Sequence, residues 1–138
     1  MSEREKMYPE TSTFHFFNVN PHKRLGGDCV VRAICVFLDI SWEQCVREMT
    51  ELGIKKGVLL NDRSCINYYL ESKGYKKMPM PRRDDNSRYT AGEFCKELAN
   101  PSKKYVLSLA HHETVVVDGK VNDIWDCTDY SVGNYWVR

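Results

Sequence analysis

The stretch that decides how the chain is organised reads Gly26-Gly27-Asp28-Cys29-Val30-Val31-Arg32-Ala33-Ile34-Cys35. Its two glycines and aspartate predict a turn and a helix cap, and the apolar residues that follow recur at helical spacing. We therefore expect a helix from about Asp28 to Leu38, with Cys29 in its first turn. A thiol at that end of a helix faces unpaired backbone N–H groups and the positive end of the helix dipole. Both favour the thiolate, which is the nucleophilic form of cysteine.

Three more helices are predicted between this stretch and residue 100. Each combines a polar capping residue with apolar residues at helical spacing. Their expected caps are Ser41, Asn61 or Asp62, and Thr90. Gly53 is expected to close the helix that Ser41 opens.

The pattern then changes from helical spacing to runs of β-branched and aromatic residues. Strands are predicted over 105–110, 114–117, 120–125 and 132–137, and Asp118-Gly119 predicts a tight hairpin turn between the second and third of them. A further short strand is expected near residues 14–19. Helices followed by consecutive strands predict an α+β fold, with N-terminal helices packed on a C-terminal antiparallel sheet. We expect a flexible leader over 1–13 and a single domain over 14–138.

Composition limits the classes of function. The chain has 138 residues, enough for one domain with a moderate core. Its 20 basic and 19 acidic residues nearly cancel, so no basic excess points to nucleic acid or to a membrane surface. The opening MSEREKMYPE lacks an apolar signal core, and no run approaches the roughly 18 apolar residues of a membrane span. With six cysteines but no CxxC pair, we expect a cytoplasmic protein, monomeric and with free thiols.

A thiol hydrolase needs a thiolate, a base that can also protonate the leaving group, and a group that fixes the imidazole tautomer. Cys29 is the one cysteine that follows a glycine turn at a predicted helix start. Far downstream, His111 and His112 precede the predicted hairpin. Because neighbouring strand residues point to opposite faces, only one of these histidines can meet Cys29.

The spacing leaves the acid open between Asp123 and Asp126. A two-residue Asp118-Gly119 loop places Asp123 on the same face as His112, whereas a bulged three-residue loop places Asp126 opposite His112. A zinc site formed by His111, His112 and Cys127 is a weaker reading, because no second metal-spaced pair supports it. We therefore expect no metal and no cofactor.

The ordered set of motifs resembles a compact bacterial or phage branch of the papain-like cysteine peptidases. The motifs that carry the resemblance are Asn20-Pro21 leading to Gly27-Asp28-Cys29-Val30-Val31-Arg32-Ala33, then His112-x-Thr114-x-Val116-x-Asp118-Gly119, then Asp123-x-Trp125-Asp126, and finally Gly133-Asn134-Tyr135-Trp136. The resemblance implies a papain-like fold, with Cys29 as nucleophile, His112 as base and Asp126 as the orienting acid in preference to Asp123. The family's glutamine before the nucleophile has no counterpart here, so Asn20 and Asn18 are the nearby candidates for an oxyanion donor, beside the Cys29 backbone N–H.

We expect a cysteine hydrolase that cleaves a peptide, isopeptide or amide bond of a peptide or protein substrate, with no nucleic-acid or membrane partner. Two alternatives stay open. The same triad could transfer the acyl group to an amine or deamidate glutamine, or the domain could be a catalytically silent binding module of the same fold.

Overall fold

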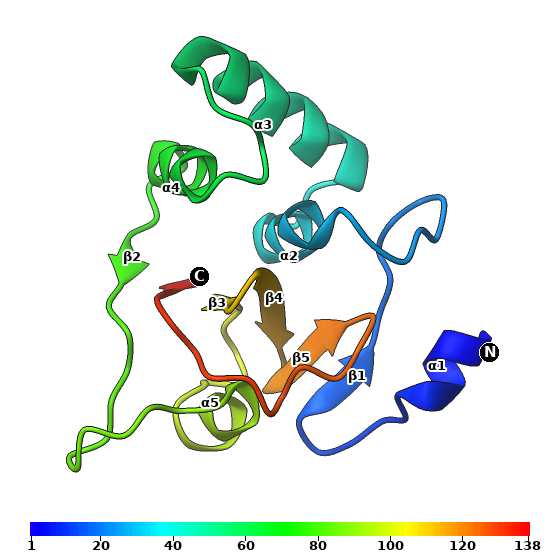
Figure 1. The fold of residues 1–138 in the computed structure, drawn as a ribbon, viewed down its shortest axis with the longest axis vertical. Helices are drawn as coiled ribbons and strands as arrows, with labels where there is room; N and C mark the ends of the chain where they lie inside the picture. Colours follow the sequence, from blue (N-terminus) through cyan, green and yellow to red (C-terminus); the bar gives the residue numbers. More distant parts are fainter.

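The computed structural model describes residues 1–138 and has an α+β fold, as predicted, with helices in the N-terminal part and a six-stranded sheet formed largely by the C-terminal part (Figure 1). The elements follow one another as α1 (Glu3–Met7), β1 (Phe14–Phe16), α2 (Cys29–Leu38), α3 (Trp42–Lys56), α4 (Arg63–Ser72), β2 (Lys77–Met78), α5 (Ala91–Glu97), β3 (Tyr105–Leu109), β4 (His112–Val117), β5 (Lys120–Asp123) and β6 (Tyr135–Val137). The predicted helix at Cys29 is confirmed. The short strand β2 had no counterpart in the sequence prediction.

The sheet is mixed rather than purely antiparallel. Its strand order is β1-β5-β4-β3-β6-β2, and every neighbouring pair is antiparallel except β1 and β5. These two run parallel, with Phe14 opposite Val121. The prediction of an antiparallel sheet is corrected at this edge, because β1 joins the sheet from a distant part of the chain and no hairpin fixes its direction.

Two apolar cores lie on the two faces of the sheet (Figure 1). The larger joins α2, α3 and α4 to one face and includes Val106, Val115 and Trp136. The smaller lies between α5 and the other face, where Phe94 packs edge-on against Tyr105. The helix that begins with Cys29 is thus held against β4 by buried side chains on its inner face.

Local capping signals set the helix starts. Ser41, Asp62 and Thr90 each accept a hydrogen bond from a first-turn backbone N–H, so these predicted caps are confirmed. The expected end of α3 at Gly53 is wrong, because the helix continues to Lys56 and is closed by Gly57 in the left-handed conformation (φ 74°). Gly53 serves a packing need instead: a Cβ atom there would lie 2.4 Å from the carbonyl oxygen of Val58.

The segment before β1 contains the short helix α1, which contacts the rest of the molecule. The Arg4 Nε atom donates to the carbonyl of Ile124 at 2.7 Å, and the Tyr8 ring packs edge-on against Phe14. The mobility expected for residues 1–13 stays a prediction.

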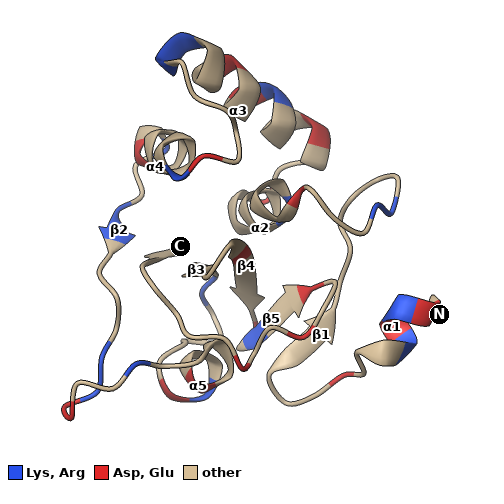
Figure 2. Ribbon diagram, viewed as in Figure 1, with Lys and Arg blue, Asp and Glu red and all other residues tan.

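Basic and acidic side chains are interspersed along α1 and α3 (Figure 2). No helix is both long and apolar enough to cross a membrane.

All six cysteines are free thiols, and five of them are buried, leaving Cys29 as the partly exposed one.

Candidate active site

Cys29 is the first residue of α2, directly after the cap residue Asp28. Gly27 precedes them with φ 83°, a left-handed conformation that lets the loop turn sharply into the helix. The first helical hydrogen bond runs from the Arg32 N–H to the Asp28 carbonyl, at 2.9 Å. The N–H groups of the residues between these two therefore have no acceptor within the helix.

Asp28 occupies the cap position but does not cap the helix with its side chain. Its carboxylate instead accepts from Asn20 Nδ2 at 2.8 Å and from Trp42 Nε1 at 3.0 Å, and it forms a buried ion pair with Arg32. An aspartate at this position usually satisfies a first-turn N–H. Because this one is held by side chains, the N–H groups around Cys29 stay available to another acceptor.

Neither asparagine proposed as an oxyanion donor lies beside the thiol. Asn20 is buried, donates to Asp28, and accepts from the His22 N–H at 2.8 Å. The Asn18 amide donates to the Arg24 carbonyl at 3.0 Å. Both side chains close the loop that leads to α2, and neither lines the cleft at Cys29, so this expectation is corrected.

His112 is the first residue of β4 and pairs with Leu109, the last residue of β3. The turn between these two strands therefore has two residues, Ala110 and His111. His111 lies in that turn with φ 53° and is exposed, whereas the His112 side chain is largely buried. The choice of His112 over His111 agrees with this placement. The two histidines are separated because His111 lies in the turn, and not by alternation along a strand.

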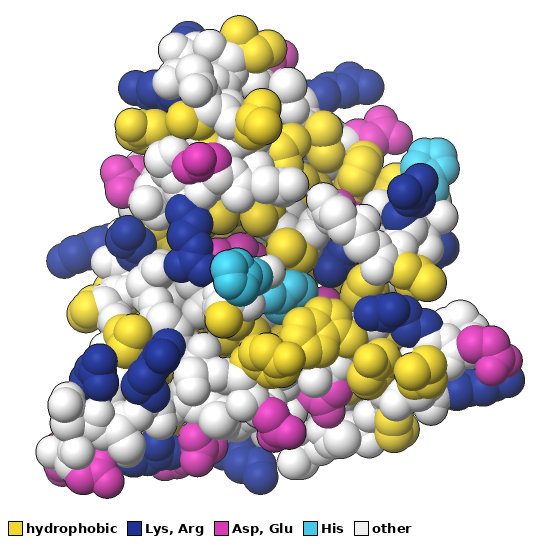
Figure 3. Space-filling view, in the orientation of Figure 1, with side chains coloured by type: hydrophobic (Ala, Val, Ile, Leu, Met, Phe, Trp, Pro, Cys, Tyr) yellow, Lys and Arg dark blue, Asp and Glu magenta, His cyan; other side chains and the backbone are white.

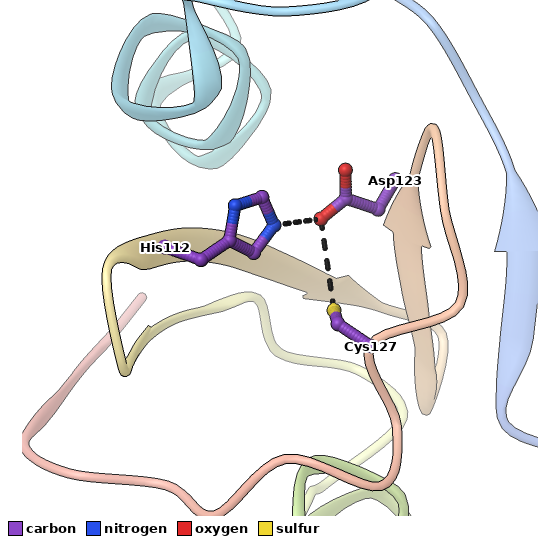
Figure 4. A group of neighbouring side chains, drawn as sticks. All are labelled: His112, Asp123 and Cys127. Atoms are coloured by element: carbon purple, nitrogen blue, oxygen red, sulfur yellow. Dashed lines mark hydrogen bonds and ion pairs between the residues drawn. The ribbon is translucent and has the colours of Figure 1, made fainter.

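Asp123, the last residue of β5, holds the His112 ring (Figure 4). Its Oδ2 atom lies 2.7 Å from His112 Nε2, accepts from the Thr114 hydroxyl at 2.7 Å, and lies 3.7 Å from Cys127 Sγ. Its Oδ1 atom accepts from the Ile124 N–H at 2.7 Å. With 3% of its surface exposed, this carboxylate is fixed on both oxygens and shielded from water.

The assignment of the acid to Asp126 is wrong in this geometry. The Asp118-Gly119 loop has two residues, since Val117 pairs with Lys120, and β5 ends at Asp123. Beyond that point the chain leaves the sheet, and Asp126 accepts from the N–H of Thr128 at 3.0 Å, as a turn cap. The hairpin register therefore brings Asp123 to His112.

An aromatic side chain covers the imidazole. The Trp125 and His112 ring centroids are 5.0 Å apart, and Trp125 packs in turn edge-on against Tyr130, 5.1 Å away. The imidazole that Asp123 holds is thus packed against a pair of aromatic rings.

Cys29 is the one cysteine whose pKa is lowered. Its burial raises the pKa, but a hydrogen bond with His112, another from the Glu113 backbone N–H, and the positive charges of His112 and Arg32 outweigh that effect. Burial raises the pKa of each of the other five thiols, namely Cys35, Cys45, Cys65, Cys95 and Cys127. Among the six thiols, Cys29 is thus the one whose surroundings favour the thiolate form.

The His112 pKa shifts in the opposite direction. Burial lowers it, but hydrogen bonds with Asp123, Cys127 and Cys29 and the charge of Asp123 raise it well above its usual range. A lowered thiol pKa beside a raised imidazole pKa favours a thiolate–imidazolium pair. The Nε2 atom of His112 is held by Asp123, so Nδ1 is the ring nitrogen left for Cys29 and a substrate.

The ligand atoms of His112, Asp123 and Cys127 lie within 4.8 Å of one another, which is the spacing of a possible metal site (Figure 4). The local charges do not fit one. Arg32 Nη2 lies 3.5 Å from Asp123 Oδ1 and His112 Nε2 lies 2.7 Å from Asp123 Oδ2, so a cationic side chain and the imidazole already occupy the two oxygens of this carboxylate. Asp123 and Cys127 instead form part of a hydrogen-bonded cluster that holds the His112 ring. Sequence reasoning missed both Thr114 and Cys127 as members of this cluster, although Thr114 follows His112 at strand spacing.

Cys29 and His112 line a cleft of about 620 Å³. Its other walls come from the start of α4 and from the β3–β4 turn, with Asn61, Arg63, Ile66, Ala110, His111 and Glu113. Figure 3 shows histidine side chains near the centre of this face, beside hydrophobic and basic surface. The thiol is thus open to a ligand on one side and packed on the other.

Comparison with known protein families, with curated proteins and with solved structures finds no match.

Proposed function

We propose that the protein is a papain-like cysteine hydrolase that cleaves a peptide, isopeptide or amide bond, with Cys29, His112 and Asp123 as its triad. The observation that carries the proposal is the position of one imidazole. His112 is bonded through Nε2 to a buried carboxylate and lines the same cleft as a thiol at a helix N-terminus. Nucleophile, base and orienting group together form the arrangement that activates a thiol.

In the first step the Cys29 thiolate attacks the carbonyl carbon, forming a C–S bond while the carbonyl π electrons move to oxygen. The first-turn N–H groups of α2, left open because Asp28 is held elsewhere, are the donors available to that oxyanion. They take the place of the absent glutamine.

In the second step the imidazolium gives its proton to the leaving amine, the C–N bond breaks, and a thioester remains on Cys29. His112 then takes a proton from water, whose oxygen attacks the thioester and releases the acid and the thiolate. Asp123 keeps the ring in one tautomer and stabilises its charged form. It is fixed for that task by Thr114 and by the backbone N–H of Ile124.

A mixture of cellular peptides incubated with the native protein tests the proposal by mass spectrometry. Hydrolysis creates new amino termini, acyl transfer joins an added amine to a carbonyl, and deamidation converts glutamine to glutamate. Cys29→Ala should abolish the reaction, and Asp126→Asn should retain it. New termini that persist in Cys29→Ala would contradict the proposal, as would a native protein that reacts with no peptide.

A further inference from the structure

A buried carboxylate that the proposed triad does not use lies next to it. Glu113 follows His112 on β4 and is 5% exposed. Its oxygens accept only from the Ser108 hydroxyl, at 3.0 and 2.9 Å. One hydroxyl has one proton, so it serves one of these oxygens at a time. No basic group lies within ion-pair distance of this carboxylate, unlike those of Asp28 and Asp123.

The strand register shows which way Glu113 points. Ser108 pairs with Glu113, and two residues along the same strands Val106 pairs with Val115. Both valines belong to the core beneath α2, α3 and α4. Since side chains alternate along a strand, Glu113 points to the same face, toward the cleft that Cys29 also lines.

Two charged groups, Arg63 and His112, act on the pKa of this carboxylate. Arg63, at the start of α4, lowers its pKa by charge alone, because the Arg63 guanidinium donates to the Leu109 carbonyl at 2.9 Å. His112 lowers it from the same strand, as does the hydrogen bond from the Ser108 hydroxyl, and Cys29 lines the same cleft from the start of α2. Burial outweighs these effects and raises the pKa of Glu113 to about 7. Figure 3 shows acidic, basic and histidine atoms meeting at the centre of this face.

We propose that Glu113 binds a substrate ammonium group in the cleft beside Cys29. An ammonium supplies the two things that the carboxylate lacks, a compensating charge and several N–H donors. The inference rests on the proposed function and deepens it: the substrates are peptides that carry a lysine side chain or a free amino terminus near the bond that is cleaved.

Charged thiol reagents test this inference on the native protein. Aminoethyl, trimethylammonioethyl and methyl methanethiosulfonate each transfer a small group to a thiolate and release methanesulfinate. The rate at Cys29, divided by the rate at a free model thiol, measures how the cleft selects the group. We expect the aminoethyl reagent to be favoured over the methyl reagent by about tenfold, which corresponds to about 1.4 kcal/mol.

The trimethylammonioethyl reagent separates binding from simple attraction. It carries the same charge without an N–H donor, so it should gain much less than the aminoethyl reagent. Equal gains for the two cations would mean attraction by the general field of the cleft and would overturn the proposal. This comparison needs no variant.

Glu113→Gln should bring the aminoethyl preference close to one. Asp118→Asn is the matched control, since it removes a carboxylate from the far turn of the β4–β5 hairpin at a left-handed position (φ 53°) that asparagine tolerates. It should keep the preference. A preference that survives in Glu113→Gln contradicts the proposal.

Two further outcomes complete the test. If the neutral methyl reagent fails to label Cys29, the proposed hydrolase fails, whereas labelling without selection overturns only the ammonium site. Protection by acetyl-lysine methylamide identifies a side-chain ammonium, and protection by alanine methylamide identifies an amino terminus. Protection by neither, at concentrations where the aminoethyl reagent is selected, would contradict the assignment to a peptide ammonium.

Discussion

The Nε2 atom of His112 and the Oδ2 atom of Asp123 lie 2.7 Å apart, at adjacent ends of β4 and β5. The two-residue loop at Asp118-Gly119 sets this pairing. It leaves the Nδ1 atom of His112 for Cys29, at the start of α2. The start of α2 and a hairpin far downstream in the chain thus meet at one imidazole.

Replacing Asp123 should impair the site far more than replacing Asp126. Asp123→Asn keeps the size of the side chain but removes the charge that orients and stabilises the imidazolium, so turnover should fall by about a hundredfold or more. Asp126→Asn should change turnover less than about threefold, because Asp126 only caps a turn. Peptide turnover at saturating substrate measures both, and comparable losses in the two variants would refute the assignment.

The two neighbouring histidines should behave differently toward a thiol reagent. His112→Ala removes the partner that lowers the Cys29 pKa, so alkylation of Cys29 by iodoacetamide near pH 6 should slow by about tenfold or more. His111→Ala should leave most of the rate, since His111 lies in the exposed turn. Site-resolved mass spectrometry gives both rates. The opposite order would show that the wrong histidine was chosen.

What the sequence predicted correctly was local. The caps at Ser41, Asp62 and Thr90 act on N–H groups two or three residues away, so a short motif contains both partners. The first turn at Cys29 is recognisable for the same reason. Gly53 shows the limit of this reasoning, because its contact with the Val58 carbonyl depends on how the chain folds back after α3.

The features that the sequence did not predict depend on contacts between residues far apart in the chain. An Asp-Gly loop permits two registers, and these deliver different aspartates to His112, so family resemblance decided and chose Asp126 incorrectly. The parallel pairing of Phe14 with Val121 has no signal in either strand alone. Asn20 was expected at the oxyanion, but the buried partner that holds it, Asp28, is defined only by the folded loop.

The stability of the protein should depend on pH through Glu113. Burial raises the pKa of this carboxyl from 4.5 to about 7 in the folded protein. The folded state therefore retains a proton that the unfolded state loses as pH rises above 4.5, and this contribution to stability is lost as pH passes through about 7.

Glu113→Gln removes that dependence and keeps an acceptor for Ser108. The free energy of unfolding of the variant minus that of the native protein should therefore increase by on the order of 2–3 kcal/mol from about pH 5 to about pH 8. Urea unfolding at the two pH values measures the difference. An unchanged difference between native and variant would show that Glu113 does not titrate in this range.

Gly53→Ala should destabilise the helical core. Its new Cβ atom would meet the backbone oxygen of Val58 at 2.4 Å, so α3 or the following turn must move. We expect a loss of about 1–3 kcal/mol, which is typical of overpacking. Gly26→Ala is the control, because a Cβ atom there has open space. Thermal unfolding of the two variants compares them, and equal midpoints would contradict the packing assigned to Gly53.

The rate of Cys29 alkylation by iodoacetamide as a function of pH tests the central claim most directly. If Cys29 and His112 form a thiolate–imidazolium pair, the rate should rise with a midpoint below pH 8.5, the ordinary pKa of a cysteine thiol. It should then hold until His112 loses its proton at high pH, and His112→Ala should return the profile to that of an ordinary thiol. A native profile that rises only around pH 8.5, and that His112→Ala leaves unchanged, would contradict the account.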